Sequence, residues 1–282
     1  MKRILIPCDF SAPAINAYRF ALDVAALSRG TVYLLNVIEL PAVPNTVFTP
    51  VRSLGGALRR EMRAKAYEKF DKISTRYKNE NVRVVSNVEF GIPSKTILNY
   101  VKKHSIDLVM MGSHGASGLK EYFVGSNTEK IVRISTVPVM VVKDFYRGPV
   151  KNIVFPNALG TENQKDLIQK VKALQTFFKA HLHLVWINTP ANFTPDTLTL
   201  KRLNTFAKQF VLRDFTINIF NHLSEEVGII QFANTIKADL IAMGTHGRKG
   251  LSHMLLGSMT EDVTNHGKSL IWTCVIKNDK NE

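Results

Sequence analysis

The sequence has few cysteines and no long apolar run. Its 282 residues include only two cysteines, Cys8 and Cys274, and neither lies in a CxxC pair or at the spacing of zinc ligands. This count gives no disulfide framework and no zinc motif. The apolar run before Asp9 is too short for a signal peptide, and no stretch approaches the roughly 18 apolar residues of a membrane span. These absences predict a soluble protein in a reducing, cytoplasmic setting.

Acidic residues are also scarce relative to basic ones. The chain has 37 Lys and Arg against 23 Asp and Glu, a formal net charge of +14. The cations are spread over many segments, and the densest cluster, Arg59–Lys72, alternates with acids at helical spacing, as a solvated helix face does. We therefore do not expect a nucleic-acid partner, and the charge favours small anionic ligands.

The second half of the chain repeats the first. MGSHGASGLKEYFVGSNTEKI, which begins at Met111, matches MGTHGRKGLSHMLLGSMTEDV, which begins at Met243, with an offset of 132 (243 − 111). Pro7 matches Pro156 with an offset of 149 (156 − 7), so the first half is 17 residues longer (149 − 132), and Pro41–Arg60 is the expected surplus loop. This period predicts two tandem domains, residues 1–145 and 150–278.

Each half alternates apolar, β-branched runs with amphipathic runs of helical period. This order predicts α/β domains, Rossmann-like and doubly wound, each with a five-stranded parallel sheet. The expected strands are 3–7, 31–38, 82–89, 108–111, 137–142, 153–156, 181–187, 216–222, 240–243 and 270–276. The expected helices are 14–28, 56–78, 93–104, 126–134, 164–179, 198–211, 225–237 and 258–266.

The glycine stretch suits an anion. Ligands of open α/β sheets bind beyond the carboxyl ends of the strands, and Gly112 follows such a strand. Gly115 also leaves room for a ligand near the backbone. Gly125 and Ser126 open a helix whose first N–H groups attract negative charge, and Thr128 adds a hydroxyl. The stretch therefore predicts a phosphate-binding loop, with a simple tight turn as the alternative.

Both glycine stretches resemble the nucleotide-binding signature of the universal stress protein family, G-x2-G-x9-G-[S/T]. The opening ILIPCDFS also resembles the first strand of that family, which ends in Pro, a small residue and Asp. The resemblance covers nearly the whole chain in a tandem form. It implies binding of ATP or AMP, with or without Mg²⁺, and slow ATP hydrolysis or none. The signature residues are Gly112, Gly115, Gly125 and Ser126 in the first half, and Gly244, Gly247, Gly257 and Ser258 in the second.

The resemblance also assigns roles within the first half. It implies that the carboxylate of Asp9 accepts a hydrogen bond from the nucleoside and that the backbone at Val37 contacts adenine. Gly112 would lie against the ribose. The phosphates would be held by Gly115, Gly125, Ser126 and Asn127.

The second half departs from this pattern. Aligned through Pro156, it has Ala158 in place of Asp9, Asn157 in place of Cys8, and Trp186 in place of Val37. We expect weaker nucleotide binding there, or none, because the acid is lost and an indole narrows the adenine slot. Asn157 replaces the acid only if the chain slips by one residue.

The favoured function is a nucleotide-dependent stress sensor or regulator with an unknown protein partner. The alternatives are a slow ATPase or nucleotidyl-transferring enzyme on the same fold, and an interaction module without nucleotide. The apolar last strands of the two halves are expected to pair as an internal pseudo-dimer, with a homodimer as the alternative. His114 and His246 are expected to be solvated loop residues, Cys8 an inert core residue, and the scattered histidines no metal site.

Overall fold

The computed structural model describes residues 1–39, 51–113, 126–157, 159, 164–245 and 269–275. These residues group into two compact units, Met1–Gly112 and Ser113–Glu282. The domain limits 1–145 and 150–278 come from the sequence repeat, whereas the two units are defined by contacts, so the domain limits stay a prediction.

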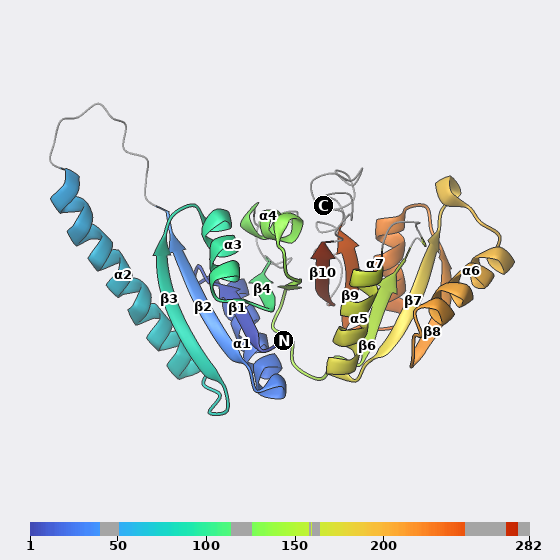
Figure 1. Ribbon diagram of the computed structural model, residues 1–282, viewed down its shortest axis with the longest axis horizontal. Helices are drawn as coiled ribbons and strands as arrows, with labels where there is room; N and C mark the ends of the chain where they lie inside the picture. Colours follow the sequence, from blue (N-terminus) through green and yellow to red (C-terminus); the bar gives the residue numbers. More distant parts are fainter. Residues whose placement is uncertain (40–50, 114–125, 158, 160–163, 246–268, 276–282) are drawn as a thin grey trace. The chain divides into compact units, whose positions relative to one another are not determined.

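The first unit is a parallel sheet with helices packed on it (Figure 1). Its strands lie in the order β3-β2-β1-β4. The central strand β1 is the core, with Ile4, Leu5 and Ile6 fully buried. The elements are β1 (Arg3–Pro7), α1 (Ala12–Ser28), β2 (Thr31–Ile38), α2 (Val51–Arg76), β3 (Arg83–Phe90), α3 (Pro93–Lys103) and β4 (Leu108–Gly112).

Helix α1 begins directly after β1 because its sequence carries a start signal. The Oγ of Ser11 accepts a hydrogen bond from the N–H of Ala14 at 3.4 Å, and Pro13 fits the first turn, where no N–H is needed. The helix ends at Arg29 in the left-handed conformation (φ 50°). A Cβ at Gly30 would lie 2.7 Å from the carbonyl oxygen of Lys2, so glycine is required where the chain returns to the sheet.

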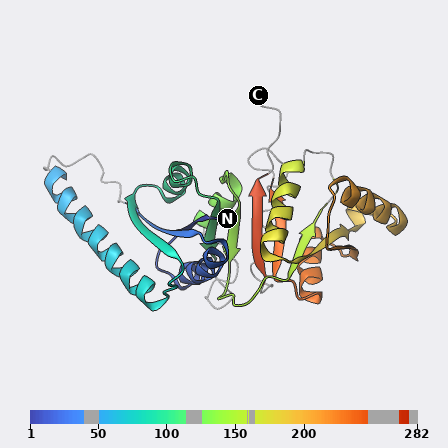
Figure 2. The same cartoon turned by 60° about the horizontal axis from the view of Figure 1, so that its bottom comes forward.

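Helix α2 lies beside the edge strand β3 and runs past the end of the sheet (Figure 2). Its charges form i,i+4 ion pairs, Glu61 with Lys65 at 2.7 Å and Glu68 with Lys72 at 2.6 Å. All four groups are well exposed. The basic cluster is thus the solvated helix face that the sequence predicts, and such pairs stabilise a helix only slightly.

The second unit contains six described strands in the order β5-β10-β9-β6-β7-β8. All neighbours are parallel except β5 and β10, which pair antiparallel through Val139 and Thr273, Met140 and Trp272, and Val141 and Ile271. The elements are α4 (Ser126–Ile134), β5 (Val139–Val142), β6 (Asn152–Pro156), α5 (Lys165–Phe178), β7 (His181–Asn188), η1 (Pro190–Asn192), α6 (Asp196–Gln209), β8 (Phe215–Asn221), α7 (Glu225–Thr235), β9 (Leu240–Thr245) and β10 (Leu270–Val275).

The repeat is visible in the hydrogen bonds. Asp107 Oδ2 accepts the N–H groups of Lys2 and Arg3 at 2.8 and 2.9 Å. Asp239, 132 residues later (239 − 107), accepts those of Lys151 and Asn152 at the same two distances. Within the described residues, five strands fall to each repeat, so the α/β class and the tandem doubly wound plan are confirmed.

The element bounds agree with the sequence to within a few residues. The largest shift is at α2, which begins at Val51 where the sequence predicts residue 56. The helix expected at 258–266 lies outside the described residues. Of the helices the structure describes, none combines the length and apolar character that a bilayer crossing needs.

Candidate nucleotide site

The carboxyl end of β1 carries the predicted acid on a tight turn. Asp9 is exposed, and its Oδ1 accepts the N–H of Ser11 at 2.9 Å. Phe10, between them, has a φ of 68°, a conformation that costs a bulky side chain energy. The turn therefore holds the carboxylate at the edge of the sheet where ligands of this fold class bind.

Phe10 is held in this turn by α2. Its ring lies 5.0 Å from the ring of Phe70, and the Nζ of Lys69 lies 5.1 Å from its centroid. Sequence reasoning missed Phe10 because a phenylalanine after Asp9 carries no visible turn signal. The contacts connect the position of Asp9 to a helix some 60 residues away in the chain.

Gly112 lies where β4 meets the start of α1. A Cβ at this position would come within 2.2 Å of the Pro13 carbonyl carbon, 2.4 Å of its oxygen and 2.5 Å of the Ala14 nitrogen. Glycine is therefore required here by packing, whatever binds nearby. The same close approach brings the end of β4 beside the turn that carries Asp9.

Val37 lies past the last paired residues of β1 and β2, Pro7 and Leu35. The carbonyl of Leu35 accepts the N–H of Cys8 at 2.8 Å, so Leu35 turns its backbone groups toward β1. Backbone groups alternate along a strand, so those of Val37 face the same side, beyond the point where β1 has turned away. This edge is where the family resemblance expects the adenine contact.

Cys8 is buried under this edge. Burial raises the pKa of its thiol to about 11, with a smaller opposing effect from a backbone hydrogen bond at Phe10. The thiol is therefore protonated at neutral pH, as the prediction of an inert residue requires. Its carbonyl accepts the amide of Asn36 at 2.8 Å, which ties β1 to β2.

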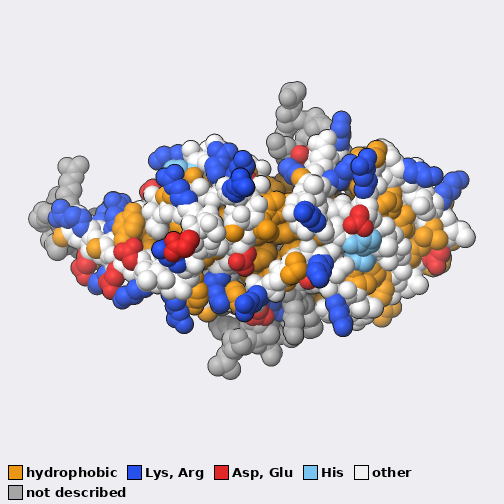
Figure 3. Space-filling view, turned by 90° about the horizontal axis from the view of Figure 1, so that it is seen from below, with side chains coloured by type: hydrophobic (Ala, Val, Ile, Leu, Met, Phe, Trp, Pro, Cys, Tyr) orange, Lys and Arg blue, Asp and Glu red, His pale blue; other side chains and the backbone are white. Residues whose placement is uncertain are grey.

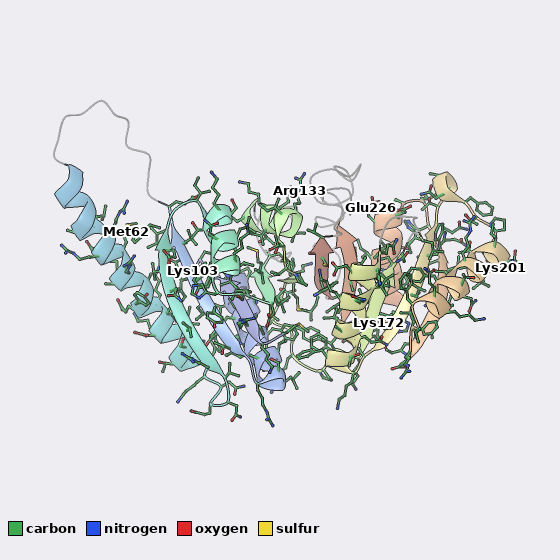
Figure 4. The ribbon with its side chains drawn as sticks, viewed as in Figure 1. Met62, Lys103, Arg133, Lys172, Lys201 and Glu226 are labelled. Carbon is green, nitrogen blue, oxygen red and sulfur yellow. The ribbon has the colours of Figure 1, made fainter. Side chains whose placement is uncertain are left out.

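Helix α4 begins at Ser126, as the sequence predicts. In its first turn Asn127 is exposed, whereas Thr128 is only 4% exposed, so of these two predicted residues Asn127 reaches solvent. Glu129, also in the first turn, pairs with Arg133 one turn further along the helix at 3.1 Å (Figure 4). Gly115, Gly125 and His114 lie outside the described residues, so the phosphate loop between β4 and α4 stays a prediction.

The second repeat has a different turn after its first strand. Asn157 N donates to the carbonyl of Val185, as Cys8 N does to Leu35, so Asn157 occupies the position of Cys8 without a slip. Its Oδ1 nevertheless accepts the N–H of Leu159 at 2.7 Å, the turn bond that Asp9 makes in the first repeat. Its amide donates to Gln164 Oε1 at 2.7 Å, and the side chain is buried. Asn157 thus keeps the local turn but presents no charge at the edge; Ala158 lies outside the described residues.

The expected match between Val37 and Trp186 is wrong by one residue. Leu35 corresponds to Val185 through the bonds above, so Ile187 matches Val37 and Trp186 matches Asn36. The error arose from carrying the offset of Pro7 and Pro156 past an extra residue before β7. The indole therefore replaces the Asn36 amide, and its buried Nε1 has no hydrogen-bond partner.

Near the end of β9 the second repeat carries a cation. Gly244 pairs with Cys274 across β9 and β10. Lys170 of α5 donates to Cys274 Sγ at 3.3 Å and to Asp166 Oδ2 at 2.7 Å. Gly247, Gly257, Ser258 and His246 lie outside the described residues, so the phosphate contacts expected of this second loop stay a prediction.

Comparisons with known proteins agree with the motif. The model of the Universal stress protein family matches residues 1–143 and 222–271. Universal stress protein MJ0577 of Methanocaldococcus jannaschii is 29% identical over 153 residues, covering 50% of this chain and 94% of that protein. Universal stress protein Slr1230 of Synechocystis is 22% identical over 282 residues, covering 93% and 96%. A universal stress protein structure from Archaeoglobus fulgidus matches with a TM-score of 0.76 at 19% identity, over 97% and 98% of the two chains, and supports the tandem fold.

Proposed function

The chain belongs to the universal stress protein family, and on this premise we propose that its first repeat binds an adenine nucleotide, ATP or AMP. The observation that carries the proposal is the exposed carboxylate of Asp9, held at the end of β1 by the Ser11 N–H and by the turn at Phe10. A fixed, solvated carboxylate beside open backbone groups suits a nucleoside, because ribose hydroxyls donate hydrogen bonds and adenine both donates and accepts them.

The proposal gives each edge residue a distinct task. Asp9 accepts a hydrogen bond from the ribose, the backbone of Val37 pairs with adenine, and Gly112 lies against the ribose. The phosphates lie against the glycine loop and the first turn of α4, where Gly125, Ser126 and Asn127 offer N–H groups. Mg²⁺ accompanies ATP only as a counterion to its phosphates.

In the second repeat we propose weak binding or none. The edge there has the buried, neutral Asn157 in place of an exposed carboxylate. The loss of one charge-assisted hydrogen bond corresponds to about 1–3 kcal/mol, or roughly a 5- to 150-fold lower affinity. The output is then regulatory: nucleotide in the first repeat changes the shape or partner choice of the chain, with little chemistry.

The test is to denature the purified full-length protein, identify any released nucleotide, and titrate the refolded or apo protein with ATP, ADP and AMP. We expect one adenine nucleotide per chain. A Gly125→Val variant should lose this binding, while Gly56→Val, on the exposed face of α2, should keep it. Turnover of labelled ATP tests the enzyme alternative. ATP hydrolysis that Gly125→Val abolishes would identify an ATPase and contradict a purely regulatory role. Absence of binding under all conditions would leave only the nucleotide-free interaction module.

We further propose that the last strands of the two repeats pair with each other within one chain, as an internal pseudo-dimer. The antiparallel pairing of β5, from the first repeat, with β10, from the second, supports this, as does the Thr273 hydroxyl, which donates to the carbonyl of Val139 at 3.4 Å. Light scattering should give the mass of one chain. A stable dimer at micromolar concentration would favour pairing between chains instead.

A further inference from the structure

Two histidines lie side by side at the start of β7. His181 and His183 are two residues apart on one strand, so both point to the same face of the sheet. Their ring centroids are 4.8 Å apart, with planes at 70°. The expectation that the histidines are scattered overlooked this i,i+2 spacing, which is meaningful only once the segment is known to be a strand.

One nitrogen of each ring has a carboxylate or amide oxygen as its partner. His181 Nδ1 lies 2.7 Å from Asp214 Oδ1, and His183 Nε2 lies 3.3 Å from Asn152 Oδ1. In neutral imidazoles these nitrogens carry the hydrogens, so the lone pairs are on His181 Nε2 and His183 Nδ1. A carboxylate or amide oxygen behind the ring is the arrangement that orients histidine ligands of metals.

Both lone pairs face one hydroxyl. Thr216 Oγ1 lies 3.0 Å from His183 Nδ1 and 3.4 Å from His181 Nε2. The Asn218 amide already donates to this oxygen at 3.3 Å, and the hydroxyl has a single hydrogen to offer. It therefore satisfies one imidazole nitrogen and leaves a lone pair on the other.

The turn that carries Asp214 is fixed by the core. The amide of the buried Gln175 donates to the carbonyls of Arg213 and Asp214 at 2.8 and 2.9 Å, and the Asp214 carbonyl also accepts from Leu182 N at 3.1 Å. Asp214 has a φ of 47°. On the same helix Lys172 donates to the Phe210 carbonyl at 2.8 Å, which anchors the chain just before this turn (Figure 4). The carboxylate behind His181 is therefore preorganised.

We propose that His181 and His183 form a two-histidine chelate for a divalent transition-metal ion, Cu²⁺ or Zn²⁺, with water in the remaining positions. Metal–nitrogen bonds of about 2.0–2.1 Å hold each ring centroid about 3.2 Å from the ion, so two ligand rings at right or tetrahedral angles lie about 4.5–5.2 Å apart. The observed 4.8 Å lies within this range. Within the described part of the chain no group of three or more His, Cys, Asp and Glu side chains is placed to hold a metal, so two protein ligands are what this site offers.

Access and protonation agree with this assignment. The side chains of His181 and Asp214 are 31% and 69% exposed, and Figure 3 shows histidine next to an acidic side chain on the surface of the molecule. The hydrogen bonds to Asp214 and Asn152 take up one nitrogen of each ring, so the other nitrogen can offer a lone pair to a metal. Imidazole nitrogens suit Cu²⁺ and Zn²⁺ better than Mg²⁺ or Ca²⁺.

The test uses the untagged full-length protein and Cu²⁺ alone, followed by electron paramagnetic resonance and by competition with Zn²⁺. We expect a Cu²⁺ signal with coupling to two imidazole nitrogens, lost in His181→Ala and in His183→Ala. His222→Ala, in the same unit, is the matched control and should keep it. Asp214→Asn, which disturbs only the support of His181, should weaken Cu²⁺ binding by roughly 10- to 100-fold.

A gain-of-affinity variant protects the test from loss of folding. Thr216→His adds a third imidazole beside the point that both rings face, where it can serve as a third ligand, and should tighten Zn²⁺ binding by at least roughly tenfold. Thermal unfolding without metal checks that all variants fold. Unchanged Cu²⁺ spectra in His181→Ala and His183→Ala, or no gain from Thr216→His in a folded protein, would overturn the chelate.

Discussion

Substitution of Asp9 separates the two tasks that the structure and the proposed function give to this carboxylate. One task is local, since Oδ1 accepts the Ser11 N–H at 2.9 Å. The other is the proposed bond to the nucleoside. Asp9→Asn keeps an oxygen for Ser11 but removes the charge, whereas Asp9→Ala removes both the oxygen and the charge.

The expected magnitudes follow from these bonds. Loss of the exposed turn bond in Asp9→Ala lowers the free energy of unfolding by about 0.5–1.5 kcal/mol, and Asp9→Asn leaves it nearly unchanged. Loss of the charged acceptor lowers ATP affinity by about 1–3 kcal/mol in both variants, roughly 5- to 150-fold in Kd. Asp9→Ala should therefore lower both ATP affinity and stability, whereas Asp9→Asn should lower ATP affinity alone.

The assay is calorimetric titration with ATP at fixed ionic strength, with urea unfolding of the same samples without ligand. Asp71→Asn, on the surface of α2, is the control for the change in net charge. If Asp9→Asn binds ATP as tightly as the parent protein, the carboxylate does not contact the nucleoside. If Asp71→Asn loses as much affinity, the effect of Asp9 is long-range charge alone.

Three further predictions concern the fold around the sites. Gly112→Ala forces a methyl group into the Pro13 backbone and should lower the free energy of unfolding by at least about 1–3 kcal/mol. Gly56→Ala, with open space around the new methyl group, should raise the free energy of unfolding by about 1 kcal/mol. Urea titrations measure both changes, and equal stability of the two variants would contradict the close approach at Gly112. Burial would raise the pKa of Asp107, but the N–H groups of Lys2 and Arg3 and the Arg3 charge lower it overall. Its stabilising contribution is therefore present above the ordinary aspartate pKa and lost as the pH falls through the lowered one, so Asp107→Asn should flatten acid unfolding curves, and parallel curves would exclude this role. Cys8, with a thiol pKa of about 11, should be roughly 1 part in 1,000 thiolate at pH 8 and react with iodoacetamide only at the rate of unfolding; fast labelling of the folded protein would refute its burial.

Much of the fold follows from local pattern. The β-branched run Thr31–Ile38 is observed as a strand with the same bounds, and the apolar stretches Leu108–Met111 and Val139–Val142 are buried as strands of a covered sheet must be. Ser11 and Pro13 mark the start of α1 because capping acts over three or four residues. Signals that act over a few neighbouring residues can be recognised in a single sequence.

Features that depend on how distant strands and helices align cannot be predicted from the sequence in the same way. The mismatch at Trp186 came from one extra residue before β7, which the sequence hides and the bond from Asn157 N to Val185 O reveals. Likewise, Gly112 reads as room for a ligand, and only the distance to Pro13 shows that packing alone demands it. The strained turn at Phe10 depends on Phe70, far along the chain, and has no local signature.

The two repeats have come to differ at equivalent places on the same scaffold. Tyr33 pairs with Leu5 as His183 pairs with Val154, and 154 is 149 positions after 5, so these two residues correspond. Each contacts the aromatic ring at the same helical position, Tyr33 to Tyr100 at 6.3 Å and His183 to Phe232 at 6.5 Å. In the first repeat this end of the sheet is an aromatic cluster, while in the second it is a histidine network backed by Asp214. The first repeat thus has an exposed acid after β1, which we propose for a nucleoside, and the second has a histidine pair at the start of β7, which we propose for a metal.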